Sequence, residues 1–220
     1  MQEALGDRPL RADARQNRDR ILAAALDVFV EQGAGAPLEE ISRRAGTGIA
    51  TLYRRFPDRF ALMRAVVIES LVRIQEEARL AAAEEPDAFS ALTRYMHRAL
   101  DIRVAAVIPA LLDELSMEDP ELEVVSNSGA KALQDLIDAA QREGMLRKDV
   151  SFGDIGTLVV RLSRPLPGAF TREVNDRLGH RHLDLLINGL RAVPDRAATI
   201  DGPAMTRDEL RQFRGGKRKG

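Results

Sequence analysis

A cluster of positive charge lies between residues 43 and 59 of this 220-residue sequence. Five side chains there are arginines and only Asp58 opposes them, so the segment carries a local excess of +4 (five minus one). A guanidinium donates hydrogen bonds in a rigid fork that matches phosphate oxygens and the O6 and N7 atoms of guanine. The whole chain carries a net charge of only −1, so this clustering, and not the overall balance, indicates an anionic partner such as nucleic acid.

A second basic segment precedes the first, from Arg8 to Arg20. This segment contains five arginines and two aspartates, Asp13 and Asp19, so its local net charge is +3. The stretch from Glu84 to Glu123, by contrast, is acidic. An isolated run of arginines is more often a solvated helix face than a binding surface. The run between residues 43 and 59 differs because it coincides with a structural motif.

That motif is two short helices joined by a glycine turn. Leu38, Ile41 and Ala45 recur at intervals of three and four residues, which predicts an amphipathic helix that ends at the glycines of residues 46–48. Leu52 and Phe56 share one face of a second helix over residues 49–56, which Pro57 terminates. Two such helices make a helix-turn-helix, whose second member lies in the major groove of DNA.

The amino-acid sequence of this segment resembles that of a known protein family. Residues 45–62 read AGTGIATLYRRFPDRFAL, and the helix before them reads RILAAALDVFVEQG. Over residues of about 15 to 65 the chain resembles the DNA-binding domain of TetR-family transcriptional regulators. Gly48 and Ile49 stand where many members carry a serine cap and a polar residue, so base recognition here is expected to use more apolar contact.

The expected DNA contacts divide into base readout and phosphate binding. Ile49 can touch a thymine methyl group, and Arg54 can reach guanine or, alternatively, a phosphate. Tyr53 and Arg59 are expected to anchor phosphates, although Tyr53 could instead pack on the first helix. The complete set of expected DNA-binding residues is Arg43, Gly48, Ile49, Ala50, Thr51, Tyr53, Arg54 and Arg59.

The first long helix must hold these residues in place. Apolar side chains at helical spacing predict its buried stripe, which consists of Ile21, Leu22, Ala25, Leu26, Phe29 and Val30. Residues 1–11 show no periodicity and contain Gly6 and Pro9, which predicts a mobile basic arm. Residues 12–57 then form the DNA-binding domain.

The remaining chain is predicted to be helical throughout, which gives an all-α fold of about nine helices in two domains. A larger domain spans residues 58–193, with Asp58 and Asp87 as helix caps, a kink at Pro109 and a proline-rich loop over residues 163–170. Residues 160–191 also resemble the C-terminal domain of one actinobacterial TetR subgroup. Residues 194–220 are expected to be a mostly disordered tail with a capping box at Thr206 and Glu209.

The sequence gives little support for a catalytic or metal-binding site. The chain has no cysteine and three histidines, of which His180 and His182 point about 200° apart on a helix and cannot share a ligand. His97 lies in an apolar helix and is expected to be a core or pocket residue. We therefore predict no enzyme, metal or cofactor. The lack of a long apolar run predicts a protein of the cytoplasm with no membrane partner.

The resemblance implies a ligand-responsive repressor that binds palindromic double-stranded operator DNA as a homodimer, through its last two long helices, and that a small-molecule effector releases. The predicted effector pocket uses Phe89, Tyr95, Met96, Val107, Ile108 and Leu111, which would look the same in a plain core. The alternative is a helical ligand carrier or interaction module without specific DNA binding.

Overall fold

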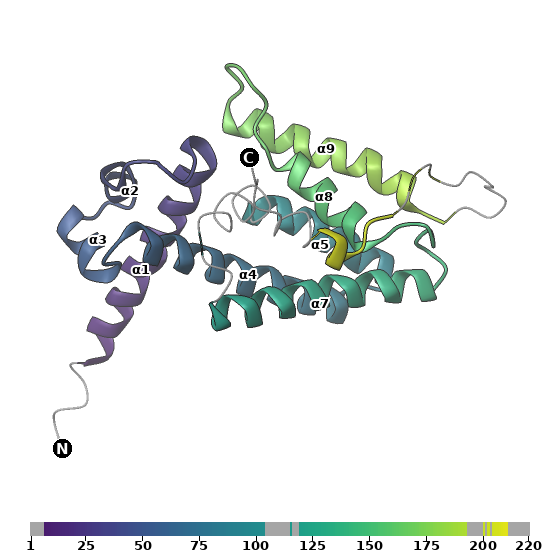
Figure 1. Ribbon diagram of the computed structural model, residues 1–220, viewed down its shortest axis with the longest axis horizontal. Helices are drawn as coiled ribbons and strands as arrows, with labels where there is room; N and C mark the ends of the chain where they lie inside the picture. The colour runs from purple at the N-terminus through teal and green to yellow at the C-terminus, as the bar shows by residue number, and fades with distance from the viewer. Residues whose placement is uncertain are drawn as a thin grey trace, which may run out of the picture. The chain divides into compact units, whose positions relative to one another are not determined.

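The computed structural model describes residues 7–103, 115, 119–192, 200, 202 and 204–210, with side chains from residue 13 onward. These ranges contain one isolated β-bridge, between Leu146 and Arg191, and no strand. The all-α prediction is therefore confirmed (Figure 1). The named helices of the described ranges are α1 (Asp7–Gln32), α2 (Leu38–Arg44), α3 (Ile49–Arg55), α4 (Arg59–Glu84), α5 (Ala88–Ile102), α7 (Pro120–Arg142), α8 (Phe152–Leu162) and α9 (Arg172–Leu190).

The described residues divide into two compact units, and the division falls inside α4. Residues up to Glu69 belong to the first unit, whereas Ser70 begins the second. The sequence predicted a boundary between residues 57 and 58. The first turns of α4 belong to the first unit because Leu62 and Met63 are buried and Arg18 of α1 reaches Glu69 at 3.2 Å.

α1 begins earlier than the sequence predicted. It starts at Asp7, so the part of the predicted mobile arm from residue 7 to residue 11 is helical instead, while residues 1–6 lie outside the described residues. Pro9 is compatible with this start because the first turn of a helix has no intrahelical acceptors for its N–H groups. The buried stripe includes Val28, whereas Leu26 and Val30 are only half-buried.

Helix ends follow the predicted caps. Asp58 accepts a hydrogen bond from the N–H of Ala61 at 2.7 Å, and Asp87 accepts one from Ser90 at 2.7 Å. In the tail, the Thr206 N–H donates to the Glu209 carboxylate at 2.7 Å and the Glu209 N–H donates to the Thr206 hydroxyl at 3.4 Å, so the predicted capping box is confirmed.

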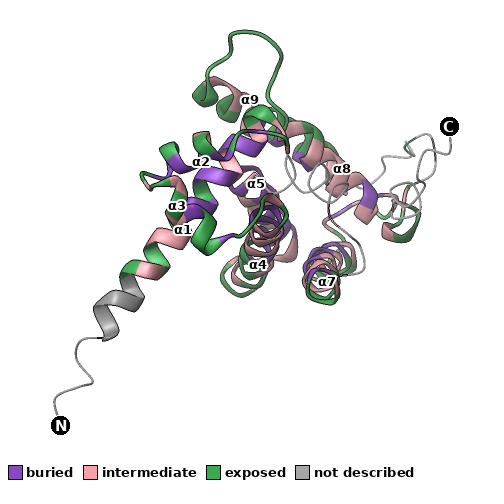
Figure 2. Ribbon diagram, turned by 60° about the vertical axis from the view of Figure 1, so that its left-hand side comes forward, coloured by how far each residue is buried: buried purple, intermediate pink, exposed green. Residues whose placement is uncertain are grey.

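The second unit is built around α5. This helix packs against α7, α8 and α9, and its buried residues fill the centre of the unit (Figure 2). The kink predicted at Pro109 lies outside the described residues. Among the residues that the structure describes, no helix is long and apolar enough to cross a membrane.

Candidate nucleic-acid interface

The turn between α2 and α3 sets the angle of the second helix. Gly46 adopts φ +64, a left-handed conformation that favours glycine. The N–H of Thr47 then donates to the carbonyl of Ser42 at 3.0 Å, which closes the end of α2. Leu52 is fully buried and Phe56 nearly so, and together they fix α3 to the core of the first unit. The predicted helix-turn-helix is confirmed.

The other side of α3 faces solvent. Gly48, Ala50 and Arg54 are exposed, and Ile49 and Thr51 are half-buried. The side chain of Tyr53 is 47% exposed, so it is not packed into the core in the way that the alternative interpretation required. These residues form one outward face, which we call the α3 face (Figure 2).

The structure gives three neighbouring arginines different surroundings. Arg55 donates to the carbonyl of Ala14 on α1 at 2.8 Å. Arg59 donates to two carbonyls of the loop between α1 and α2, at residues 34 and 36. Arg54 makes no hydrogen bond or ion pair within the described ranges, so its guanidinium is available to a ligand. A phosphate contact by Arg59 would have to use its remaining nitrogens.

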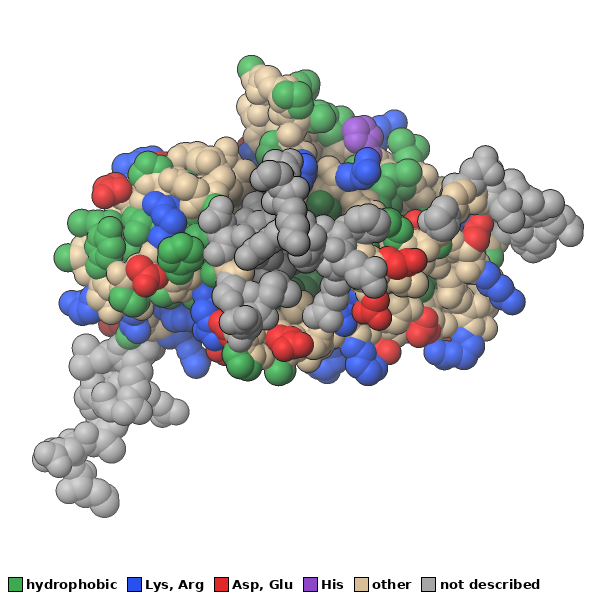
Figure 3. All heavy atoms as spheres, in the orientation of Figure 1, with side chains coloured by type: hydrophobic (Ala, Val, Ile, Leu, Met, Phe, Trp, Pro, Cys, Tyr) green, Lys and Arg blue, Asp and Glu red, His purple; other side chains and the backbone are tan. Residues whose placement is uncertain are grey.

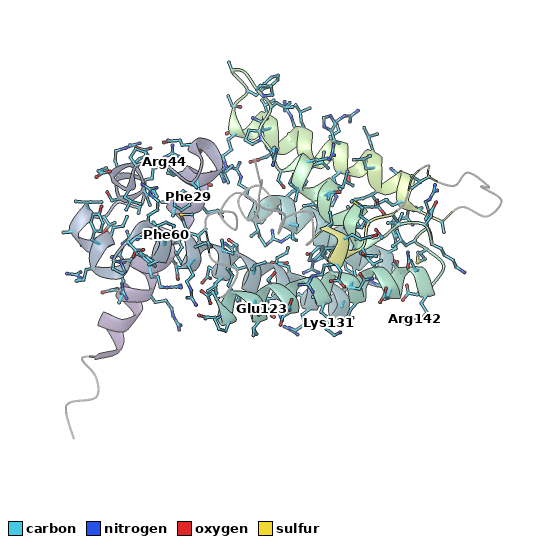
Figure 4. The ribbon with its side chains drawn as sticks, in the orientation of Figure 1. Phe29, Arg44, Phe60, Glu123, Lys131 and Arg142 are labelled. Carbon is cyan, nitrogen blue, oxygen red and sulfur yellow. The ribbon has the colours of Figure 1, made fainter. Side chains whose placement is uncertain are left out.

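On α2 the arginines are ion-paired, although their spacing in the sequence did not predict these pairs. Arg43 binds both carboxylate oxygens of Glu40, at 2.9 and 2.8 Å. Arg44, which Figure 4 labels, binds Glu40 at 2.7 Å and Glu31 of α1 at 2.6 Å. The hydrogen bonds from Arg43, and then those from Arg44, lower the pKa of Glu40 to about 2. The Arg43 side chain remains 72% exposed, so it can still approach a phosphate.

A small hollow of about 320 Å³ lies beside the α3 face, between α1 and α3. Its lining consists of Asp13, Ala14, Asn17, Arg54 and Arg55. Lys and Arg side chains gather along this edge of the first unit (Figure 3). Such a surface can bind an anionic partner that has a groove, through hydrogen bonds and electrostatic attraction. The described part of the chain contains no group of three side chains suited to a metal ion.

The structure describes three of the six residues predicted to line an effector pocket. Phe89 and Met96 are 1% exposed and Tyr95 is 8% exposed, so all three are core residues of α5. The guanidinium of Arg191 covers the Phe89 ring at 4.3 Å. Val107, Ile108 and Leu111 lie outside the described residues.

The second unit instead has an open groove of about 730 Å³ between α4 and α7, closed at one end by the start of α5. Alanines supply much of its lining, and acidic side chains surround it. The alanines are Ala78, Ala82, Ala88, Ala91, Ala132 and Ala139. The charged residues are Glu76, Arg79, Glu85, Asp87, Asp135 and Glu143. Of the predicted pocket residues, the three that the structure describes, Phe89, Tyr95 and Met96, do not line it.

Comparison with known proteins agrees with this geometry. Residues 21–66 match the bacterial regulatory proteins of the tetR family, and residues 87–192 match the C-terminal domain of SbtR-like transcriptional regulators. The crystal structure of the TetR transcriptional regulator SCO0520 from Streptomyces coelicolor is 32% identical, with a TM-score of 0.57 over 80% of this chain and 99% of the other. This chain belongs to the TetR family.

Two further relatives place it within that family. A TetR regulator from Mycobacterium vanbaalenii is 36% identical, with a TM-score of 0.56, and the match covers 83% of this chain and 99% of the other. The uncharacterized regulator TtgW of Pseudomonas putida is 40% identical over 57 residues, which span 26% of this chain and 42% of TtgW. As a TetR-family member, the chain is a DNA-binding transcriptional regulator and not an enzyme.

Proposed function

We propose that this regulator represses transcription by binding a palindromic operator as a homodimer, and that a small molecule bound to its second unit releases it. The observation that carries the proposal is the α3 face, where Tyr53 is 47% exposed and Arg54 has no partner within the described ranges. The proposed target is DNA, so the protein would act in the cytoplasm, at the nucleoid.

Base readout is assigned to the start and the outward side of α3. Gly48 and Ala50 are exposed and small, so the helix can enter the major groove deeply. Ile49 then contacts a thymine methyl group, and the guanidinium of Arg54 donates to guanine O6 and N7.

Phosphate binding is assigned to side chains at the edges of the same face. Tyr53 is 47% exposed, and Thr51 lies in the first turn of α3. Arg43 would exchange one of its bonds to Glu40 for a phosphate oxygen, since its side chain is 72% exposed. These contacts fix the register of the protein on DNA without reading sequence.

Dimerisation is assigned to α8 and α9. A single short helix reads only a few base pairs, so specificity requires two copies whose half-sites lie about 34 to 36 Å apart. Leu185 and Leu186 on α9 are 62% and 40% exposed, which leaves adjacent large apolar side chains unburied on one helix. A second copy packed there would bury them by two-fold symmetry.

Effector control is assigned to α4 and the groove beside it. α4 is one continuous helix that begins in the DNA-binding unit and lines the groove with residues between Val72 and Ala82. Ala91 of α5 also lines the groove, and Tyr95 follows it by one turn on the same face of α5. An effector that binds the DNA-incompetent state more tightly by about 3 kcal/mol would shift the equilibrium somewhat over a hundredfold.

The test begins with selection of duplexes from a randomised DNA pool by the full-length protein. Affinity for the selected duplex and for a scrambled one is then measured by fluorescence anisotropy over a range of salt concentrations. Arg54→Ala should weaken binding to the selected duplex by roughly fivefold to 150-fold and reduce discrimination, because a bidentate guanine contact is worth about 1 to 3 kcal/mol.

The matched control is Arg79→Ala, since Arg79 is also an exposed helical arginine but lies on the groove of the second unit. This variant should bind both duplexes with native affinity. Equal losses on both duplexes for Arg54→Ala would assign that residue to a phosphate. Failure of the pool to enrich any sequence would favour the carrier or interaction module instead.

A further inference from the structure

A five-residue pattern occurs twice in the second unit, once in each of two packed helices. Residues 97–101 of α5 read HRALD, and residues 180–184 of α9 read HRHLD. Within each helix the first histidine and the aspartate are four residues apart and share a face. The structure nevertheless pairs them across the helices. His97 Nε2 lies 3.1 Å from Asp184 Oδ1, and His180 Nε2 lies 2.9 Å from Asp101 Oδ1.

The two imidazole rings meet between these carboxylates. The Nδ1 atoms of His97 and His180 are 2.8 Å apart, the ring centroids are 5.1 Å apart and the ring planes differ by 10°. The centroid distance is about the largest that two imidazoles can have at that Nδ1 separation. The line between the nitrogens therefore passes close to both ring centres, so the rings lie edge to edge and not face to face. This is the geometry of a straight N–H···N hydrogen bond.

The net charge of the four side chains, His97, His180, Asp101 and Asp184, depends on how many protons the two imidazole rings hold. Each Nε2 faces a carboxylate oxygen, so each carries a hydrogen and donates it. The two Nδ1 atoms would then be two facing lone pairs unless one of them also holds a proton. Three ring protons on two imidazoles amount to one positive charge, held between the negative charges of Asp101 and Asp184. We propose that His97 and His180 share a single proton and form a pH-dependent lock that holds α9 on α5.

Other charges nearby support this assignment. Arg98 donates to Asp101 at 3.1 Å and to Glu77 of α4 at 3.0 Å, which fixes the orientation of the Asp101 carboxylate. On α9, Arg177 and Arg181 are exposed at positions that flank His180. In the described part of the chain, no hydrogen bond or ion pair joins α7 or α8 to the four groups of the lock.

The alignment suits a proton and not a metal ion. A metal held in line between two imidazole nitrogens needs them about 4 Å apart, since each metal–nitrogen bond is about 2.0 to 2.1 Å. At 2.8 Å the gap accommodates one hydrogen.

The lock works only in its singly charged state. A fourth proton would place two N–H groups against each other and force the rings apart. Loss of the shared proton would leave either two facing lone pairs or one Nε2 lone pair against a carboxylate. The contact between α5 and α9 should therefore be strongest at an intermediate pH and weaken toward pH 5, in the range where histidines in proteins titrate.

The decisive experiment is a pH titration of the full chain labelled with ¹⁵N in its histidines, followed by NMR. We expect a low-field proton that correlates with the Nδ1 atoms of both His97 and His180, and protonation of the pair in two separated steps. His182 is the internal control, because it lies on the same helix, is exposed and belongs to neither contact. If all three histidines titrate in independent single steps and no shared proton is seen, the proposal is wrong.

A second measurement tests the lock through stability. The folded-to-unfolded ratio is measured by urea unfolding between pH 5 and pH 8. For the native chain and for His182→Gln, this ratio should fall about tenfold as the pH is lowered toward 5, which is the effect of a pKa difference of about one unit between the folded and unfolded states. His97→Gln should lose this dependence, and an unchanged profile in that variant would overturn the proposal. If His97→Gln fails to fold, the NMR titration of the native chain decides alone. Neither measurement requires DNA or a dimer, so its result is independent of the proposed function.

Discussion

Arg59→Ala separates two roles for the arginine that follows the helix-turn-helix. The sequence predicted a phosphate anchor, whereas the structure shows its Nη1 atom donating to the carbonyls of residues 34 and 36. These bonds fix the loop that joins α1 to α2. Removing them should therefore lower the free energy of unfolding, in addition to any effect on DNA.

The size of the loss follows from the geometry. A hydrogen bond from a charged donor is worth about 1.5 to 3 kcal/mol. Here one nitrogen serves both carbonyls and the side chain is half-exposed, so the two bonds do not add fully. We expect a loss of about 2 kcal/mol, which is roughly a 30-fold change in the folded-to-unfolded ratio.

Urea unfolding of the full chain, followed by circular dichroism, measures this loss, and two neighbouring arginines provide controls. Arg54→Ala should change the free energy of unfolding by less than about 0.5 kcal/mol, as for an exposed residue without a partner. Arg55→Ala removes one exposed hydrogen bond to Ala14 and should cost about 0.5 to 1 kcal/mol.

The opposite outcome would restore the phosphate role. If Arg59→Ala unfolds like the native protein, while the slope of log affinity for DNA against log salt falls by about one unit, then Arg59 neutralises a phosphate. A change in both quantities would mean that the guanidinium serves the loop and the DNA together.

Three other perturbations test the second unit. In Gly153→Ala the added Cβ would clash with the carbonyl oxygen of Met205, so the tail should detach at a cost of about 1 to 3 kcal/mol and be cleaved faster by protease. The control Gly156→Ala meets only Phe152, at 3.7 Å, and should stabilise α8 by up to about 1 kcal/mol; equal behaviour of the two variants would refute the contact. Burial raises the pKa of Tyr95, so stability should fall as pH rises above about 10, and one of the two tyrosines should resist ionisation in an ultraviolet titration until the chain unfolds. Leu185→Asp should convert a dimer to a folded monomer in sedimentation, and a persistent dimer would exclude this part of α9 from the interface.

The helical fold and the helix-turn-helix were predictable because their signals are local. Apolar spacing, glycine at a left-handed turn and an aspartate or threonine cap act within a few residues of one another. Asp58, Asp87 and Thr206 cap their helices as predicted. The start of α1 was mispredicted because a proline was interpreted as a break, although the first turn of a helix tolerates it.

The partners of individual arginines were not predictable, since they lie far away in sequence. Arg59 contacts carbonyls more than twenty residues earlier, and Arg55 contacts one that is 41 residues away. Charge counting treats Arg54, Arg55 and Arg59 as equivalent cations. Backbone carbonyls carry no sequence signal, because every residue supplies one, so only the fold could distinguish the arginine without a partner from those that stabilise the domain.

The effector pocket shows why large apolar residues are a poor guide to a cavity. Phe89 and Met96 were predicted to line a pocket, but large side chains fill the space they reach, and both are 1% exposed. The groove between α4 and α7 forms where side chains are short, at alanines such as Ala78, Ala82 and Ala139. Because two helices can lie side by side at alanines without filling the space between them, alanines at helical spacing on facing helices are the sequence signal to search for. In this chain Ala78 and Ala82 of α4, four residues apart, and Ala132 and Ala139 of α7, seven residues apart, carry that signal and line the groove.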